Sequence, residues 1–245
     1  MPGSTEYLVE KYMTGSIILT LGFFFGSFVI AFLSIFSSFS VIAGEAEQGV
    51  LQASLPRPFP RWHWYLGRWI GYVSLGILYA LVLFASILLV TYIHAGIPSD
   101  AVALTKSFLL FAFVVPILIS VAMLGSCFFS ALGNGVFMTM LFGAGWLGGM
   151  IEKLGGALQL EEAVSRPLMT IAGTMSLLMP VDAVQRRMLT EMFNLPDLEG
   201  IVNLNRDLGP FSFNQAPSDA FLIYTACYTP LALAAGMLLF RRKDL

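Results

Sequence analysis

The chain has 245 residues, of which 57% are hydrophobic and 11% charged, and its formal net charge at pH 7 is −2. A soluble domain carries about 25% charged residues because its surface must be hydrated, so this composition excludes a water-soluble globule. The absence of a basic excess also argues against nucleic acid as a partner. We therefore expect an all-α, polytopic transmembrane helical bundle with the lipid bilayer as its main surroundings.

The first long apolar stretch predicts a membrane-spanning helix over residues 15–43. No Asp, Glu, Lys or Arg occurs between Tyr12 and Gly44, so the stretch is long enough to cross as one tilted helix. The residues before it are polar and lack the basic-then-apolar layout of a cleavable signal peptide. We expect this helix to insert as part of the mature protein.

A second span is predicted over residues 69–95, after a polar segment at 45–68. Trp62, Trp64 and Trp69 lie where that segment meets the span. Indole rings favour the headgroup layer of a bilayer, so this cluster indicates a membrane–water boundary.

Residues 107–151 contain no charged residue, a length that is too great for one crossing and suits two. The break between them is predicted at 132–135, because the Leu-Gly-Asn-Gly sequence there favours a turn. The resulting spans are 107–131 and 136–151. The second span is rich in glycine, which we interpret as close helix packing in preference to a pore lining.

Residues 152–218 form an amphipathic segment, broken by prolines and expected to lie outside the cell. Within it, 168–179 is apolar but reaches only about 18 Å as a helix, against a hydrocarbon core of about 30 Å. We expect an interfacial or re-entrant piece there. The last span is predicted over 219–241. The chain is thus interpreted as one transmembrane domain with about five full spans plus that piece.

Basic residues near the helix ends predict the orientation in the cell membrane, since cytoplasmic loops are enriched in Lys and Arg. The Arg-Arg-Lys run at 241–243 places the C-terminus in the cytoplasm. Counting back through the spans places 45–68 in the cytoplasm and the N-terminus outside. Three arginines of the external segment run against this rule, which has less force in long segments: Arg166, Arg186 and Arg187.

The polar segment at 45–68 carries the most informative motif. It follows Gly44 and predicts a short helix along the cytoplasmic surface, ended by Pro56. The residues expected on its apolar stripe are Val50, Leu51 and Leu55, and those expected to project to water are Glu45, Glu47 and Gln48. A rigid, acid-tipped element between two spans is suited to receive force from a soluble partner. From the residues alone, an ordinary cytoplasmic loop is an equally good interpretation.

This segment resembles the cytoplasmic signature of the type-2 ATP-binding-cassette (ABC) exporter permeases, in which an acidic pair, a glycine, an apolar run, Ser/Thr-x-Pro, an arginine and a Gly-Lys or Gly-Arg pair follow in order. The matching residues are Glu45, Glu47, Gly49, Leu51, Ser54, Pro58, Arg61, Gly67 and Arg68. The Met-Pro-Val-Asp-Ala-Val-Gln-Arg run at 179–186 resembles the Asn-Pro-Val-Asp-x-x-Arg run of the subgroup that contains the nitrous-oxide-reductase maturation permease. The basic ending at 240–245 resembles the tail of that subgroup.

The resemblance implies a permease subunit that forms the pathway for an unidentified substrate and is driven by a separate ABC ATPase subunit. It also implies a homodimer or heterodimer of permeases. The residues to which it assigns ATPase coupling are Glu45, Glu47, Gly49, Leu51 and Arg61. Family members usually have one more helix before the span that precedes this signature. Its absence leaves three interpretations open: a truncated chain, a misassigned start, or a member with five helices.

Several other activities lack their motifs in this sequence. No Gly-x-x-x-x-Gly-Lys-Ser/Thr phosphate loop occurs, so the chain is not expected to hydrolyse ATP itself. No metal-binding pattern is found, and the Gly-x-Gly-x-x-Gly outline at 143–148 is not interpreted as a cofactor site, because no strand precedes it and it lies within a predicted span. No charge lies deep within a predicted span, which argues against the alternative of a secondary carrier or channel not coupled to ATP. An intramembrane enzyme would need a reactive pair that the spans do not offer.

Overall fold

A computed structural model describes residues 5–50, 60–95, 100–157, 162–193 and 217–242, and every regular element in these ranges is an α-helix. In chain order the helices are α1 (Thr5–Ser38), α2 (Ala43–Glu47), α4 (Arg61–Ala95), α5 (Ala101–Gly125), α6 (Ala131–Ala157), α7 (Glu162–Leu178), α8 (Val181–Phe193) and α11 (Asp219–Arg242). Five of them, α1, α4, α5, α6 and α11, provide stretches long and apolar enough to cross a bilayer. The predicted all-α bundle with five spans is confirmed.

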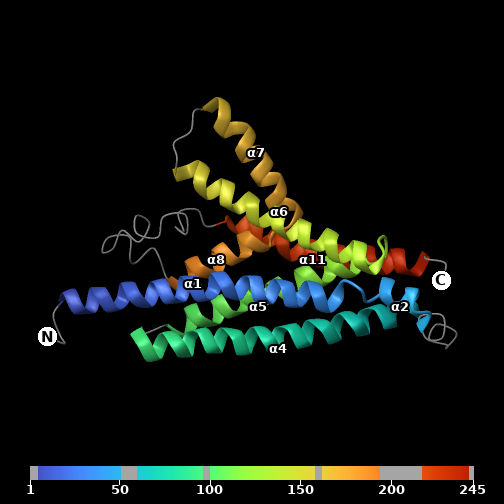
Figure 1. Cartoon of the computed structure of the whole chain (residues 1–245), viewed down its shortest axis with the longest axis horizontal. Helices are drawn as coiled ribbons and strands as arrows, with labels where there is room; N and C mark the ends of the chain where they lie inside the picture. Colours follow the sequence, from blue (N-terminus) through green and yellow to red (C-terminus); the bar gives the residue numbers. More distant parts are fainter. Residues whose placement is uncertain (1–4, 51–59, 96–99, 158–161, 194–216, 243–245) are drawn as a thin grey trace.

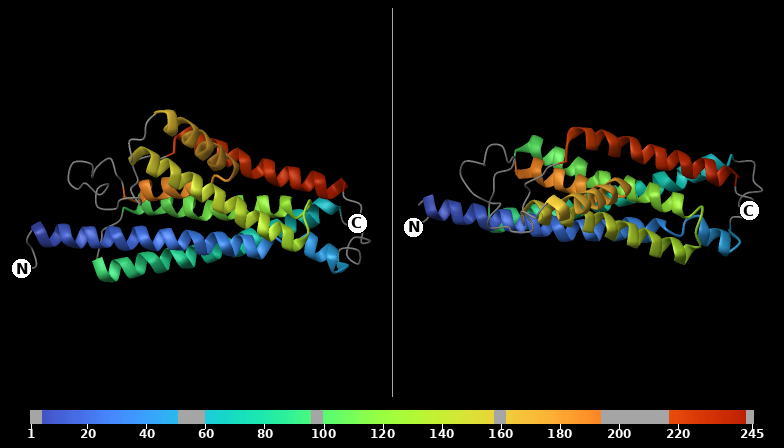
Figure 2. Two further views of the ribbon diagram at one scale, coloured as in Figure 1. Left: turned by 45° about the horizontal axis from the view of Figure 1, so that its top comes forward. Right: turned by 90° about the horizontal axis from the view of Figure 1, so that it is seen from above.

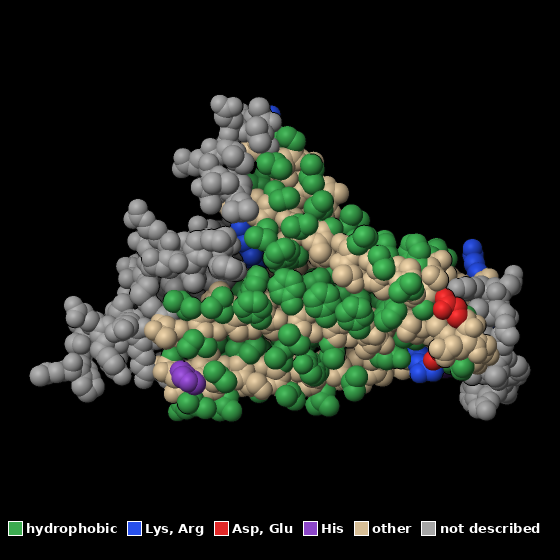
Figure 3. All heavy atoms as spheres, viewed as in Figure 1, with side chains coloured by type: hydrophobic (Ala, Val, Ile, Leu, Met, Phe, Trp, Pro, Cys, Tyr) green, Lys and Arg blue, Asp and Glu red, His purple; other side chains and the backbone are tan. Residues whose placement is uncertain are grey.

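Helix α5 forms the centre of the bundle. Of its apolar window, 67% is buried, against 22% for α4 and for α11. Three phenylalanines join α1, α4 and α5: Phe23 lies with its ring centroid 5.1 Å from that of Phe84 and 5.6 Å from that of Phe111. The outer helices expose large apolar side chains such as Leu78. Figure 3 shows hydrophobic side chains along the length of one face, as expected for a surface in contact with lipid.

The turn between the third and fourth spans was predicted in the wrong place. α5 ends at Gly125 and α6 begins at Ala131, so the connection is 126–130 and the Leu-Gly-Asn-Gly sequence at 132–135 lies in the first turns of α6. These residues are used for packing and capping. A Cβ at Gly135 would lie 3.0 Å from the ring of Phe39, and the Asn134 side chain donates hydrogen bonds to two backbone carbonyls.

Helices α7 and α8 meet at an angle of 91°, with the bend at Met179–Pro180. Figures 1 and 2 show that both limbs open toward the end of the bundle where α1 begins, while the bend lies part-way along it. A bent pair of this kind is either a broken span or a re-entrant loop, and limbs that open toward one end have the form of a re-entrant loop (Figures 1 and 2). The short apolar piece predicted at 168–179 is therefore one limb of a bent pair, and α8 is its second limb.

The two ends of the bundle are formed by different segments of the chain. α2, the start of α4, the 126–130 turn and the end of α11 gather at the end opposite the start of α1 (Figures 1 and 2). Here the Arg61 guanidinium donates a hydrogen bond to the Arg241 carbonyl, with 3.4 Å between Nη1 and O. We call residues 39–50, 60–68, 126–134 and 240–242 the α2 end. We call α7, α8 and the residues that bind them the hairpin region.

Candidate functional site

Helix α2 is shorter than the sequence predicts. It spans Ala43–Glu47 and is followed by Gly49, whose φ is 74°. That left-handed conformation is open to glycine without strain and commonly ends a helix. The predicted continuation to Pro56 is therefore interrupted at Gly49. Leu51, one of the residues to which coupling was assigned, lies outside the described residues, as do the rest of 51–59.

Glu45 does not project freely into water, contrary to expectation. Its Oε1 atom lies 2.5 Å from Nη2 of Arg68, and the side chain is 20% exposed against 42% for Arg68. The Arg68 guanidinium also lies over the ring of Trp64, 5.3 Å from its centroid. The pair fastens α2 to the first turns of α4.

Glu47 is exposed, as predicted, but its carboxylate also binds within the chain. Its Oε1 accepts a hydrogen bond from the backbone N–H of Ala131, at 2.9 Å. Ala131 is the first residue of α6, where unpaired N–H groups and the helix dipole favour a carboxylate. The side chains that remain exposed beside it are those of Gln48 and of Val50, which is 43% exposed.

Four of the five predicted coupling residues thus lie at the α2 end. Arg61 begins α4 and binds the Arg241 carbonyl, so the α2 end joins α4 to α11 as well. Glu45, Glu47 and Gly49 lie in or directly after α2, and Arg61 is the first residue of α4, which begins at the same end of the bundle (Figure 1). Both acids bind other parts of the chain, and Glu47 is nevertheless exposed at the surface together with Gln48 and Val50.

The hairpin region contains a buried ion cluster that sequence reasoning missed. Arg186 on α8 is only 7% exposed. Its Nη2 lies 2.6 Å from Oε2 of Glu152 on α6, and its Nε lies 3.0 Å from Oδ2 of Asp182. Ser176 on α7 donates to the other oxygen of Glu152, at 3.4 Å. The cluster therefore joins α6, α7 and α8 through one carboxylate.

The glycines of α6 form the face on which the hairpin packs. A Cβ at Gly145 would lie 2.7 Å from the Met179 carbonyl oxygen, and one at Gly148 would lie 2.9 Å from that of Ala172. A Cβ at Gly149 would collide with the carboxylate of Asp182. The interpretation of these glycines as close-packing residues is confirmed for these three positions.

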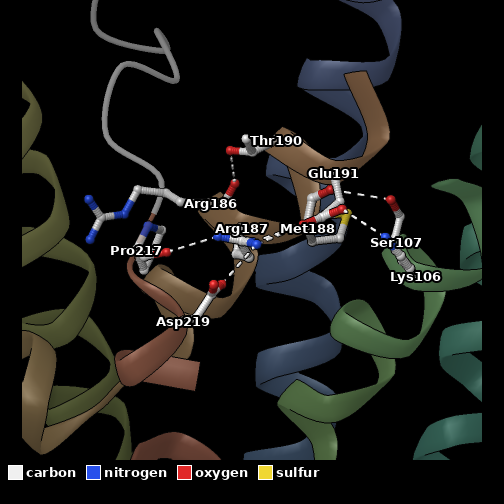
Figure 4. A network of polar contacts seen from close by, with 9 residues as sticks. All are labelled: Lys106, Ser107, Arg186, Arg187, Met188, Thr190, Glu191, Pro217 and Asp219. Atoms are coloured by element: carbon white, nitrogen blue, oxygen red, sulfur yellow. Dashed lines mark hydrogen bonds and ion pairs between the residues drawn. The ribbon is translucent and has the colours of Figure 1, made fainter. Parts of the chain in front are cut away.

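A second polar network joins α8 to α5 and α11 (Figure 4). Arg187 Nη2 lies 2.9 Å from Oε1 of Glu191 and 3.1 Å from Oδ1 of Asp219, the first residue of α11. Glu191 in turn lies near Lys106 on α5, with 3.8 Å between Oε2 and Nζ. The Ser107 hydroxyl donates to the Met188 carbonyl at 3.3 Å. These contacts fasten α8 to the first turns of α5 and α11.

Two tyrosines of α11 bind the last residues of α7, beside the bend. Tyr224 donates to the carbonyl of Leu177 at 2.8 Å, and Tyr228 donates to that of Leu178 at 2.9 Å. The last carbonyls of a helix have no partner within it, and in a bilayer such groups must be satisfied by the protein. The one-turn spacing of the tyrosines matches two successive carbonyls at the end of α7.

Comparison with known proteins gives one result for the whole chain. The sequence model of a family described as "ABC-2 family transporter protein" matches residues 5–245. None of the curated proteins matches the chain. Among the described residues, no group of His, Cys, Asp or Glu is arranged to hold a metal ion.

Proposed function

Since the chain belongs to the ABC-2 family, as the membrane subunit of an ABC transporter, we propose that its α2 end is the surface on which a separate ATPase subunit docks. Membership of this family decides between an ATP-driven permease and an uncoupled carrier or channel in favour of the permease. Family permeases work with ABC ATPase subunits and carry no ATPase site of their own.

The observation that carries the docking proposal is the way α2 is fastened. The Glu45–Arg68 pair connects it to α4, and the Glu47 carboxylate connects it to α6. A partner that moves α2 therefore acts on more than one spanning helix. Such a movement can be sustained only if the partner binds one arrangement of the helices more tightly than another.

Within this surface we assign two kinds of role. Glu45 and Glu47 position α2, because their carboxylates bind other parts of the chain. Gln48 and Val50 are exposed and face the ATPase. For Leu51 a contact with the ATPase rests on the family resemblance alone.

We further propose that the α2 end and the C-terminus lie in the cytoplasm. Arg61, Arg241 and Arg242 all belong to this end, in keeping with the enrichment of basic residues on the cytoplasmic side. Arg186 and Arg187 would then lie on the outer half, but both are paired with acids. Their charge is therefore a weak argument against this orientation.

The orientation can be tested by labelling in intact cells, in a background without Cys127 and Cys227. Cysteine at Gln48, an exposed position of the α2 end, should react with an impermeant thiol reagent only after permeabilisation. Cysteine at Asp100, an exposed position at the opposite end, should react without it. The reverse pattern would overturn the proposal.

The assembly we propose is a pair of permeases, either two copies or one copy and a relative, with the substrate pathway between them. α5 occupies the centre of the described bundle, so a pathway fits better between two bundles than through one. We also place the chain nearest the subgroup of the nitrous-oxide-reductase maturation permease. The support is the run at 179–186, in which Pro180 lies at the bend and Asp182 pairs with Arg186.

Docking is tested by Val50→Asp, with the permease co-expressed with the ABC ATPase encoded nearest to it. A carboxylate buried without a partner in the interface should cost several kcal/mol and weaken binding by orders of magnitude. The matched control is Val102→Asp, the same change at an exposed valine of α5 at the opposite end. Co-purification that falls for Val50→Asp and not for the control supports the proposal. Equal retention of the ATPase by both variants would remove α2 as the docking surface.

A further inference from the structure

We propose that α2 and the 126–130 turn form one interlocked unit that transmits movement of α2 to α6 and the hairpin, with Ser126, Glu47 and Asn134 as its positioning residues. This inference rests on the proposed docking of the ATPase at the α2 end. It adds the route by which a movement there reaches the opposite half of the molecule.

Ser126 supplies the N-terminal cap that α2 lacks in its own sequence. The residue at the N-cap of α2 is Ile42, which has no side-chain oxygen and makes no side-chain cap. Instead, the Ser126 hydroxyl oxygen accepts hydrogen bonds from the N–H groups of Ile42, at 3.1 Å, and of Ala43, at 2.9 Å. Ser126 is fully buried and lies 83 residues from Ala43 in the chain. The first turn of α2 is therefore held by the turn between α5 and α6.

Glu47 makes the reciprocal contact. It is the last residue of α2, and its carboxylate caps the first residue of α6, Ala131. One segment thus caps the helix of the other in both directions. Because each bond ends on a backbone group, α2 cannot shift against the turn without breaking a cap at one helix or the other.

The buried Asn134 side chain joins two further segments to this unit. Its Nδ2 atom donates to the carbonyl of Phe39, at 2.6 Å, and to that of Ala122, at 2.8 Å. Phe39 follows α1 and leads into α2, whereas Ala122 lies in the last turn of α5. Asn134 is fully buried, and both hydrogens of its amide are used. Neither aspartate nor leucine can make these two bonds, since an ionised carboxylate only accepts and leucine has no polar group.

From this unit a continuous set of contacts leads to the hairpin. Asn134 and Ala131 belong to α6, the helix whose glycine face holds the bend and whose Glu152 binds Arg186. A contiguous path does not by itself prove coupling, which requires an element whose two states both sites bias. The experiments therefore measure first the interlock and then its effect at the hairpin.

The interlock is tested by amide hydrogen exchange of the purified permease, with no partner present. Ser126→Ala should lower protection of the Ile42 and Ala43 amides by about tenfold, the effect of losing about one net hydrogen bond. Ser130→Ala is the matched control, because the Ser130 hydroxyl caps only its own turn, accepting from Gly133 N–H at 3.2 Å. Unchanged protection at Ile42 and Ala43 in Ser126→Ala would overturn the interlock.

Transmission is tested in the complex with the ATPase, using spin labels at Ile171 on α7 and Tyr92 on α4, both exposed. ATP with vanadate should change the distance between the labels in the otherwise unaltered chain. Ser126→Ala and Asn134→Asp should lose at least half of that change, measured on the fraction of permease that carries the ATPase. Ser130→Ala should keep it.

The outcomes separate this inference from docking itself. If the ATPase binds but the distance does not change in any chain, or changes equally in all of them, the unit does not transmit movement. Failure of the ATPase to bind the unaltered chain would instead refute docking at the α2 end. In that case the exchange experiment still decides whether the interlock exists.

Discussion

The α2 end and the hairpin region each hold a short helix against the bundle, by different means. α2 is held at its ends by a serine, a glutamate and an asparagine that bind backbone groups, and by one half-exposed ion pair. α8 is held by a buried arginine between two carboxylates and by glycines that let it touch α6. A helix that is to receive a partner, as we propose for α2, must keep a surface accessible, whereas any segment within a bilayer must satisfy its polar groups inside the protein. The hairpin region should therefore tolerate substitution less well than the α2 end.

The largest effect on stability is expected for Arg186→Met. The change removes the guanidinium that the carboxylates of Glu152 and Asp182 both bind, and breaking a buried ion pair in this way costs about 3–5 kcal/mol. Thermal unfolding of the permease in detergent or nanodiscs measures this loss of stability. The control is Arg187→Met at the next position, which is 23% exposed and whose partners Glu191 and Asp219 are 25% and 84% exposed, so a smaller loss of about 1 kcal/mol is expected. Similar losses for the two variants would contradict the difference between the buried and the exposed network.

The second-largest loss of stability is expected for Gly149→Ala. The added methyl collides with the Asp182 carboxylate, and overpacking of this kind costs about 1–3 kcal/mol. Gly143→Ala, on the same helix, meets no other atom within 4 Å and should be neutral or stabilising by up to about 1 kcal/mol. Unfolding temperatures of the two variants make the comparison. A stabilised Gly149→Ala would show that the hairpin does not pack against α6 at this point.

A smaller loss is expected when the carbonyls at the bend lose their donors. Tyr224→Phe and Tyr228→Phe each remove one hydrogen bond to the end of α7, and such bonds in a bilayer contribute on the order of 0.5–1.5 kcal/mol. The double variant should lose about the sum. Tyr92→Phe, at a phenol that is 71% exposed, serves as the control. If the control loses as much stability as either variant, the two phenols do not support the bend.

The smallest effect on stability is expected at the α2 end. Glu45→Gln weakens a pair whose arginine is 42% exposed, so unfolding should change by less than about 1 kcal/mol. Association with the ATPase should fall, because α2 loses its link to α4. The double exchange Glu45→Arg with Arg68→Glu should restore part of the association with the ATPase, as measured by co-purification. Loss of stability as large as that of Arg186→Met would erase the distinction between the two regions.

Part of the candidate site could be predicted from the sequence, because neighbouring residues decide it. The motif at 45–61 indicated residues at one end of the bundle, and four of the predicted coupling residues lie at that end, where their role in coupling stays a prediction. Glu47 is exposed as predicted, whereas Glu45 is largely covered and does not project into water. Glu45 and Glu47 turn toward Arg68 and Ala131, partners that belong to helices distant in the sequence.

The five spans follow from the sequence by itself, since a long charge-free stretch in lipid can satisfy its backbone only by local helical hydrogen bonds. The short reach of 168–179 likewise predicted an interfacial or re-entrant segment, and the bent pair of α7 and α8 lies there. Only the tertiary structure decided that the Leu-Gly-Asn-Gly sequence would lie inside α6, where Asn134 binds carbonyls of two other segments. It alone decided that Glu152 would meet Arg186, 34 residues further along the chain. Helix formation depends on each residue's near neighbours, whereas capping and ion pairing depend on which helices pack side by side.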